Sequence, residues 1–131
     1  MPVFEQEDYV AAAISSVLGQ THRELELIIV DDGSGDETAD IVSAFRDSRI
    51  RYVRRDRRLG LAARRNEAIE MAAGEYVAQM DADAVCAPDR LAVQLLSLRA
   101  GYDICGSWAT RGAHPLRPDG TVSFPVGSKA L

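Results

Sequence analysis

The fold is indicated most directly by one segment, YVAQMDAD at residues 76–83. Its first five residues are mostly apolar or β-prone, and Gly74 just before them breaks the preceding helical pattern. They predict a buried strand over residues 76–80. The strand leads into Asp81 and Asp83, and open α/β sheets bind their ligands at that end of their strands.

Asp81 and Asp83 are separated by one small residue, Ala82. On an extended backbone, residues two apart point to the same side, so both carboxylates are expected to face one spot. Hard divalent cations such as Mg²⁺ and Mn²⁺ prefer oxygen ligands of this kind. Acidic pairs are also common in solvated turns, which is the more frequent explanation of an isolated Asp-x-Asp. The strand context favours a metal site at Asp81 and Asp83.

The composition fits a single domain over residues 1–131, with a core over 1–108 and an irregular tail over 109–131. Hydrophobic residues make up 47% of the 131 residues, enough for an aliphatic core, while glycines and prolines gather in the tail. The net charge of −5 argues against nucleic acid as a partner, because the protein's overall field would repel it.

No apolar run approaches the length of a membrane span, so the chain itself is expected to be soluble. Cys86 and Cys105 lack the spacing of a metal site or a disulfide framework, which suits a reducing compartment. We therefore expect a cytoplasmic protein, and attachment to the inner face of a membrane through another segment stays open.

Apolar periodicity and turn residues divide the chain into alternating elements. Helices are predicted over residues 9–18, 38–45, 61–73 and 89–98, and strands over 25–30, 50–53, 76–80 and 102–108. This alternation predicts an α/β, Rossmann-like fold, with a mostly parallel sheet flanked by helices. The carboxyl edge of that sheet would gather Asp31, Asp32, a basic loop over residues 54–58, and the Asp81/Asp83 pair.

Such an edge combines metal ligands with cationic groups, which suits a nucleoside diphosphate. Simpler explanations remain for each part. The acidic run at residues 31–36 could be only a turn that precedes a helix, and the arginines at 54–58 could be a solvated loop. A dinucleotide-binding domain has less support, because no Gly-x-Gly-x-x-Gly follows the strand at 25–30.

Seven short motifs occur in an order and at a spacing that resemble the nucleotide-sugar-binding half of a family 2 glycosyltransferase with the GT-A fold. They cover roughly residues 2–108. The motifs are Pro2-Val3-Phe4, Ser16-x-x-x-Gln20-Thr21, Glu26-x-x-x-Val30-Asp31-Asp32-Gly33-Ser34-x-Asp36-x-Thr38, Gly60-Leu61-Ala62-Ala63-Arg64-Arg65-Asn66, Gly74-Glu75-Tyr76, Asp81-Ala82-Asp83 and Pro88-Asp89-Arg90.

The resemblance implies a metal-dependent sugar transfer from a nucleotide-sugar, with inversion at the sugar. Phe4 would lie against a uracil-like ring, and Asp32 would accept a hydrogen bond from the base, which favours a UDP-sugar. Asp83, with Asp81, would hold Mg²⁺ or Mn²⁺ on the diphosphate. The implied nucleotide-binding residues are Pro2, Phe4, Glu5, Asp32, Gly60, Arg65, Asp81 and Ala82.

The chain also departs from the family pattern. Glu5 stands where the family usually has Asn, so its carboxylate either enters the base pocket or points to solvent. Ala84 replaces a frequent acidic residue after the Asp-x-Asp. Relative to the family the chain is truncated at both ends, without the acceptor half and its general base, so no catalytic residue is assigned. A non-catalytic nucleotide-sugar-binding or interaction module is therefore the alternative function.

The body of the family's first strand is also absent from the sequence, which begins with the end of that strand at Pro2. We expect the strand at residues 25–30 to keep unpaired backbone groups, because its neighbour in the sheet is short. An exposed edge of this kind predicts self-association into a homo-oligomer, filling of the gap by another segment, or marginal stability.

Overall fold

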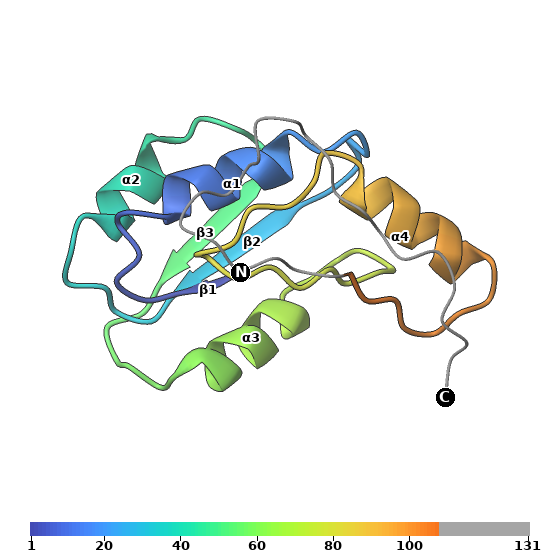
Figure 1. Cartoon of the computed structure of the whole chain (residues 1–131). Coiled ribbons are helices and arrows are strands. Elements are labelled where there is room, and N and C mark those ends of the chain that lie inside the picture. Colours follow the sequence, from blue (N-terminus) through green and yellow to red (C-terminus); the bar gives the residue numbers. More distant parts are fainter. Residues whose placement is uncertain (108–131) are drawn as a thin grey trace.

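The computed structural model describes residues 1–107, which contain a three-stranded parallel sheet with helices on both faces (Figure 1). The strand order is β1-β2-β3, with β1 at Pro2–Val3, β2 at Leu27–Asp31 and β3 at Ile50–Arg54. β2 pairs in parallel with both neighbours, and the register places Asp31 between Val3 and Arg54. The carboxyl ends of all three strands therefore meet at one edge.

Four helices accompany the sheet: α1 at Val10–Leu18, α2 at Thr38–Ala44, α3 at Leu61–Glu70 and α4 at Arg90–Arg99. α1 and α2 lie on one side of the sheet and α3 lies on the other (Figure 1). The predicted α/β class, the four helices and the first two long strands are confirmed, with ends shifted by a few residues.

β2 forms the centre of the core, and all five of its residues are buried. Its side chains face helices on both sides, which explains why the sequence reads as a continuous apolar run rather than an alternating one. Ile29 packs in one cluster with Ile14 of α1 and Val42 of α2. This packing fixes the end of β2, and with it the position of Asp31 and Asp32 at the sheet edge.

The predicted strand over residues 76–80 is not a strand in the structure. Val77 is 56% exposed, and Met80 is the one residue of the segment that is buried. In the described residues the sheet ends at β1, which contributes only Pro2 and Val3. An edge of two residues is too short to support a further ladder of backbone hydrogen bonds.

The predicted strand over residues 102–108 is also wrong for the part that the structure describes. Residues 102–107 form no strand, and Ile104 is 88% exposed. Trp108 and the predicted irregular tail at 109–131 lie outside the described residues.

The edge of β2 beside β1 is partly paired by the first residue of the chain. The amino nitrogen of Met1 donates to the Ile28 carbonyl at 2.8 Å, and the Met1 carbonyl accepts from the Val30 N–H at 3.0 Å. Part of the predicted gap is thus filled from within the chain, and self-association stays a prediction.

The segment between Asp83 and α4 is tied to α1 by Gln20, which is fully buried. The Gln20 side-chain oxygen accepts from the Leu91 N–H at 2.9 Å, and its nitrogen donates to the Ala87 carbonyl at 2.6 Å. α4 itself has no buried residue. Gln20 therefore links the end of α1 to the chain that follows the acidic turn, together with the Ser16 hydroxyl, which accepts from the Cys86 N–H at 3.2 Å.

Among the residues that the structure describes, no helix combines the length and the apolar character that crossing a bilayer requires.

Candidate functional site

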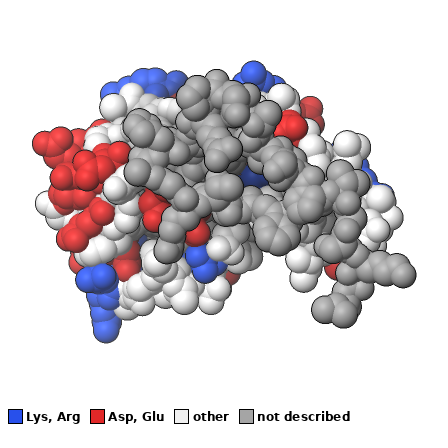
Figure 2. Space-filling model, viewed as in Figure 1, with Lys and Arg blue, Asp and Glu red and all other residues white. Residues whose placement is uncertain are grey.

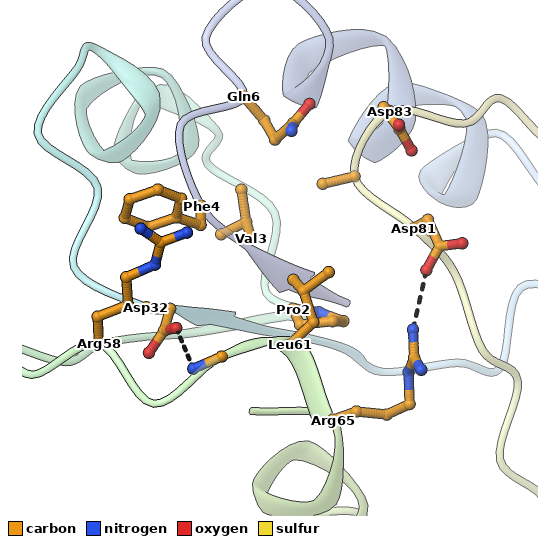
Figure 3. A pocket seen from close by; sticks show the side chains of 12 residues that line it. Pro2, Val3, Phe4, Gln6, Asp32, Arg58, Leu61, Arg65, Asp81 and Asp83 are labelled. Carbon is orange, nitrogen blue, oxygen red and sulfur yellow. Dashed lines mark hydrogen bonds and ion pairs between the residues drawn. The ribbon is translucent and has the colours of Figure 1, made fainter. Parts of the chain in front are cut away.

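A pocket of about 330 Å³ opens at the carboxyl edge of the sheet (Figure 3). β1 and the loop after it supply one wall, the turn at residues 81–83 another, and the start of α3 a third. The lining residues are Pro2, Val3, Phe4, Gln6, Asp32, Arg58, Gly60, Leu61, Arg65, Asp81, Ala82 and Asp83.

The structure brings together nearly all of the residues predicted from the sequence. Those that line the pocket are Pro2, Phe4, Asp32, Gly60, Arg65, Asp81, Ala82 and Asp83. Glu5 does not line it: its side chain is exposed, which matches the alternative that the carboxylate points to solvent. The individual roles of these residues stay predictions. Val3 belongs to the segment from Pro2 to Glu5 that was expected to line the base pocket, and Arg58 to the basic loop expected at this edge. Gln6 and Leu61 were missed, although they flank predicted positions.

The carboxylate of Asp32 holds the turn that precedes α3. Oδ1 accepts from the Leu59 N–H at 2.8 Å, and Oδ2 accepts from the Gly60 N–H at 2.7 Å. Arg64 Nε donates to Oδ1 at 2.6 Å. Asp32 is 1% exposed. Burial raises its pKa, but the two backbone hydrogen bonds and Arg64 outweigh burial, so the pKa lies below its ordinary value.

This arrangement bears on the predicted hydrogen bond from a base to Asp32. Oδ1 already has two donors, whereas Oδ2 has one, and a carboxylate oxygen can accept more than one hydrogen bond. Any further donor would therefore meet Oδ2. The observed contacts show that Asp32 also shapes the pocket, because they place the backbone of Gly60 in its wall.

Arg64 is a buried cation that the sequence analysis did not single out. Besides Asp32, it contacts Glu67 Oε2 through Nη1 at 2.8 Å and donates through Nη2 to the Arg57 carbonyl. Arg55 pairs with the same Glu67. Hydrogen bonds from Arg55 and Arg64 hold the pKa of Glu67 below its ordinary value. In the sequence, the acidic Glu67 three residues after Arg64 in a predicted helix could have indicated that the two side chains pair.

Asp31 has a structural role in the turn after β2. Its Oδ1 accepts from the Ser34 N–H at 2.8 Å and from the Ser34 hydroxyl at 2.7 Å, and its Oδ2 accepts from the Tyr52 hydroxyl at 2.8 Å. Burial, then the hydrogen bond to Asp31, raises the pKa of Tyr52. The simpler explanation of the acidic run, as a turn, is therefore correct for Asp31, while Asp32 lines the pocket.

The guanidinium of Arg58 lies over the ring of Phe4, 3.8 Å from its centroid (Figure 3). Both residues line the pocket. The basic loop at residues 54–58 is exposed, as the solvated-loop interpretation predicts, but one of its arginines reaches an aromatic face. Cation–π contacts of this kind prefer Arg and contribute modestly at exposed positions.

Asp81 and Asp83 lie on one turn at the opposite wall from Phe4 (Figure 3). Asp81 Oδ1 pairs with Arg65 Nη2 at 3.2 Å, and the Asp81 side chain is 58% exposed. Within residues 1–107, no group of three or more His, Cys, Asp and Glu side chains is placed to hold a metal. Two exposed carboxylates fit a cation that takes its remaining ligands from water and substrate oxygens.

The chain is similar to several glycosyltransferases over most of its length. The profile of the family described as Glycosyl transferase family 2 matches residues 1–120. An Escherichia coli relative, the UDP-Glc:alpha-D-GlcNAc-diphosphoundecaprenol beta-1,3-glucosyltransferase WfgD, is 38% identical over 95 residues, which are 72% of this chain and 38% of the relative. The glycosyltransferase GlyG of Streptococcus pneumoniae is 34% identical over 85 residues, 63% of this chain and 28% of GlyG.

The fold matches solved structures as well. The crystal structure of S. aureus TarS 1-349 in complex with UDP superposes with a TM-score of 0.70 at 26% identity, covering 76% of this chain and 30% of that chain. The chain thus spans less than half the length of these relatives. The match supports the predicted GT-A-like fold. From the extent of the family match, the chain belongs to glycosyl transferase family 2 and corresponds to an N-terminal portion of its members.

Proposed function

We propose that this chain binds a UDP-sugar together with Mg²⁺ or Mn²⁺, as the donor-binding part of an inverting glycosyltransferase. The observation that carries the proposal is the two-ended pocket. One end presents the ring of Phe4 and the buried carboxylate of Asp32, and the other presents Asp81 and Asp83. A nucleoside diphosphate has the same polarity, with an aromatic base at one end and charged phosphates at the other.

At the base end, Phe4 offers an aromatic face to a pyrimidine ring, and Asp32 Oδ2 is the acceptor for a ring N–H. An acceptor at this position favours uracil, which carries an N–H where cytosine carries a bare nitrogen. The crystal structure of the similar TarS holds UDP. WfgD is described as using UDP-Glc. Both names support a uridine donor for this chain.

At the phosphate end, Asp83 and Asp81 would hold the cation, and Arg65 is the nearest cationic side chain. A bound Mg²⁺ or Mn²⁺ supplies Lewis-acid stabilisation of the leaving nucleoside diphosphate. Arg65 neutralises Asp81 in the ligand-free chain, so we expect it to turn toward phosphate oxygens when the cation takes over that carboxylate. The transfer also needs a base to deprotonate the acceptor hydroxyl, and no residue is assigned to that step.

Calorimetric titration with UDP, with and without Mn²⁺, tests this proposal. We expect binding that depends on Mn²⁺ and that weakens about tenfold or more in Asp83→Ala, because a lost ligand affects metal affinity at least as strongly as a lost supporting contact. Asp8→Ala is the matched control, since Asp8 is an exposed aspartate outside the pocket. Equal binding by Asp83→Ala and the unaltered chain would rule out this metal site.

The alternative, a non-catalytic nucleotide-sugar-binding module, shares the donor site and differs in turnover. Release of UDP from a UDP-sugar, measured in the presence of Mn²⁺ and candidate acceptors, separates the two. Binding without any UDP release across these acceptors would favour the module.

A further inference from the structure

The loop that follows Phe4 is bound by three consecutive backbone amides. Glu5 N–H donates to the Ser34 hydroxyl oxygen at 3.0 Å, Gln6 N–H to Thr38 Oγ1 at 2.8 Å, and Glu7 N–H to Asp36 Oδ2 at 3.2 Å. Each acceptor comes from the Asp-Gly-Ser-x-Asp-x-Thr run, which follows β2 and ends at Thr38, the first residue of α2. The run therefore binds the loop residue by residue.

The two hydroxyls are themselves oriented by carboxylates. The Ser34 hydroxyl donates to Asp31 Oδ1, so its oxygen is left to accept from Glu5. The Thr38 N–H donates to Asp36 Oδ1 at 3.1 Å, and the Thr38 side chain helps to hold the pKa of the Asp36 carboxyl below its ordinary value. A hydroxyl has one proton, and once a carboxylate takes it, the lone pairs face the loop amide. Ser34 and Thr38 are buried, which strengthens these contacts.

Glu5 shows that the loop needs such contacts. Its φ is 50°, a left-handed conformation that Glu rarely adopts. Backbone of this kind persists where the surroundings hold it in place. The Glu5 side chain is exposed and makes no part of the pocket wall, whereas its neighbours Phe4 and Gln6 do. The turn at Glu5 thus sets where those two side chains point.

The acidic run contributes by holding the loop rather than by touching a diphosphate. Figure 2 shows acidic side chains gathered on the surface at the end of the molecule where α2 lies. A negatively charged surface of this kind repels phosphate groups. Of the run's residues after β2, only Asp32 lines the pocket.

We propose that Ser34 and Thr38 are positioning residues, which hold the loop that carries Phe4 and Gln6 at the base end of the pocket. The inference rests on the proposed function, because it assigns this loop to base recognition. In the proposed function Phe4 holds the base ring where Asp32 Oδ2 meets the ring N–H, so loosening the loop should reduce discrimination between bases and leave the phosphate end unchanged.

Thr38→Val tests the inference, since valine keeps the shape of threonine and removes the hydroxyl that accepts from the Gln6 N–H. Thr38→Ser restores the hydroxyl, and Ser43→Ala removes an exposed hydroxyl from the same helix as a matched control. Hydrogen exchange in the free protein should be faster at the Gln6 amide in Thr38→Val by about fivefold or more, as expected for one lost hydrogen bond. Thr38→Ser and Ser43→Ala should exchange like the unaltered chain.

Binding of UDP and CDP, measured with Mn²⁺, gives the functional readout. The two ligands share the diphosphate and differ in the base, so general destabilisation changes both Kd values equally. We expect the ratio of the CDP Kd to the UDP Kd to fall about fivefold in Thr38→Val and to recover in Thr38→Ser. An unchanged ratio in Thr38→Val would overturn this inference alone. Absence of UDP binding by the unaltered chain would overturn the proposed function, and the inference with it.

Discussion

Arg64 and Asp32 form a buried ion pair, with Arg64 Nε 2.6 Å from Asp32 Oδ1. The two residues lie 32 positions apart in the sequence and join the start of α3 to the end of β2. Because Asp32 also binds the Leu59 and Gly60 amides, this pair fixes the turn that forms one wall of the pocket.

Arg64→Met should destabilise the protein strongly. The substitution keeps much of the side chain's apolar volume but leaves the Asp32 carboxylate buried without its cation, which typically costs about 3–5 kcal/mol. Urea unfolding followed by circular dichroism measures the change in the free energy of unfolding. The double variant Asp32→Asn/Arg64→Met should recover part of the loss. A loss below about 1 kcal/mol in Arg64→Met would mean that water reaches this carboxylate.

Stability should fall on acidification, and Asp32 should contribute to the fall. Its pKa in the folded protein lies below the ordinary value of 3.8. The Asp32 contribution is therefore complete above that value and is lost as the pH falls through the lower, folded-state pKa. Urea unfolding at a series of pH values between about 7 and 2.5 should show a flatter acid limb in Asp32→Asn. Parallel curves for the two proteins would contradict a lowered pKa of Asp32 in the folded protein.

The central part of the fold could be predicted from the sequence because its signals are local. The apolar run of β2 and the amphipathic pattern of α1 each determine one element. The segment at 76–80 has an equally good strand pattern, yet it is exposed and forms no strand, and an apolar pattern does not itself provide a neighbouring strand to pair with. Partner length is a property of the sheet and cannot be deduced from the segment itself.

The residues that line the pocket could be predicted in part for a similar reason. Asp32 follows β2 and Gly60 precedes α3, so the topology brings both to one edge, whereas Asp81 follows a segment that forms no strand in the structure. The contact of Arg58 with Phe4 could not be predicted, because geometry selects one of several neighbouring arginines. For Arg64 the sequence offers the spacing to Glu67, but nothing in it points to Asp32. The left-handed backbone at Glu5 was also missed, since nothing in that residue type favours it.

Gln20→Leu should loosen the chain after the acidic turn. Leucine has a similar volume but cannot bond to Leu91 or Ala87. The Ala87 carbonyl keeps the Arg90 N–H, whereas the Leu91 N–H loses the Gln20 oxygen, and a polar backbone group left without its partner costs about 1–3 kcal/mol. We expect a lower melting temperature and faster hydrogen exchange at the Leu91 amide. Gln79→Leu is the control, because its side chain is exposed. Equal melting temperatures for the two variants would show that α4 is held by other contacts.

Arg58→Ala should strengthen the binding of uridine. In the ligand-free chain the guanidinium covers one face of the Phe4 ring at 3.8 Å from the centroid, which leaves no room for a base on that face. A base that stacks there must displace Arg58 and lose a contact of about 0.5–1 kcal/mol, so removing Arg58 should lower the uridine Kd about two- to fivefold.

Uridine carries no phosphate, and the lost positive charge therefore has no direct effect on its binding. Arg57→Ala, an exposed neighbour outside the pocket lining, should leave the uridine Kd unchanged. Weaker uridine binding by Arg58→Ala would instead show that the guanidinium supports the base. The base would then stack on the other face of Phe4, or the guanidinium would donate to the carbonyl oxygens of the uracil ring.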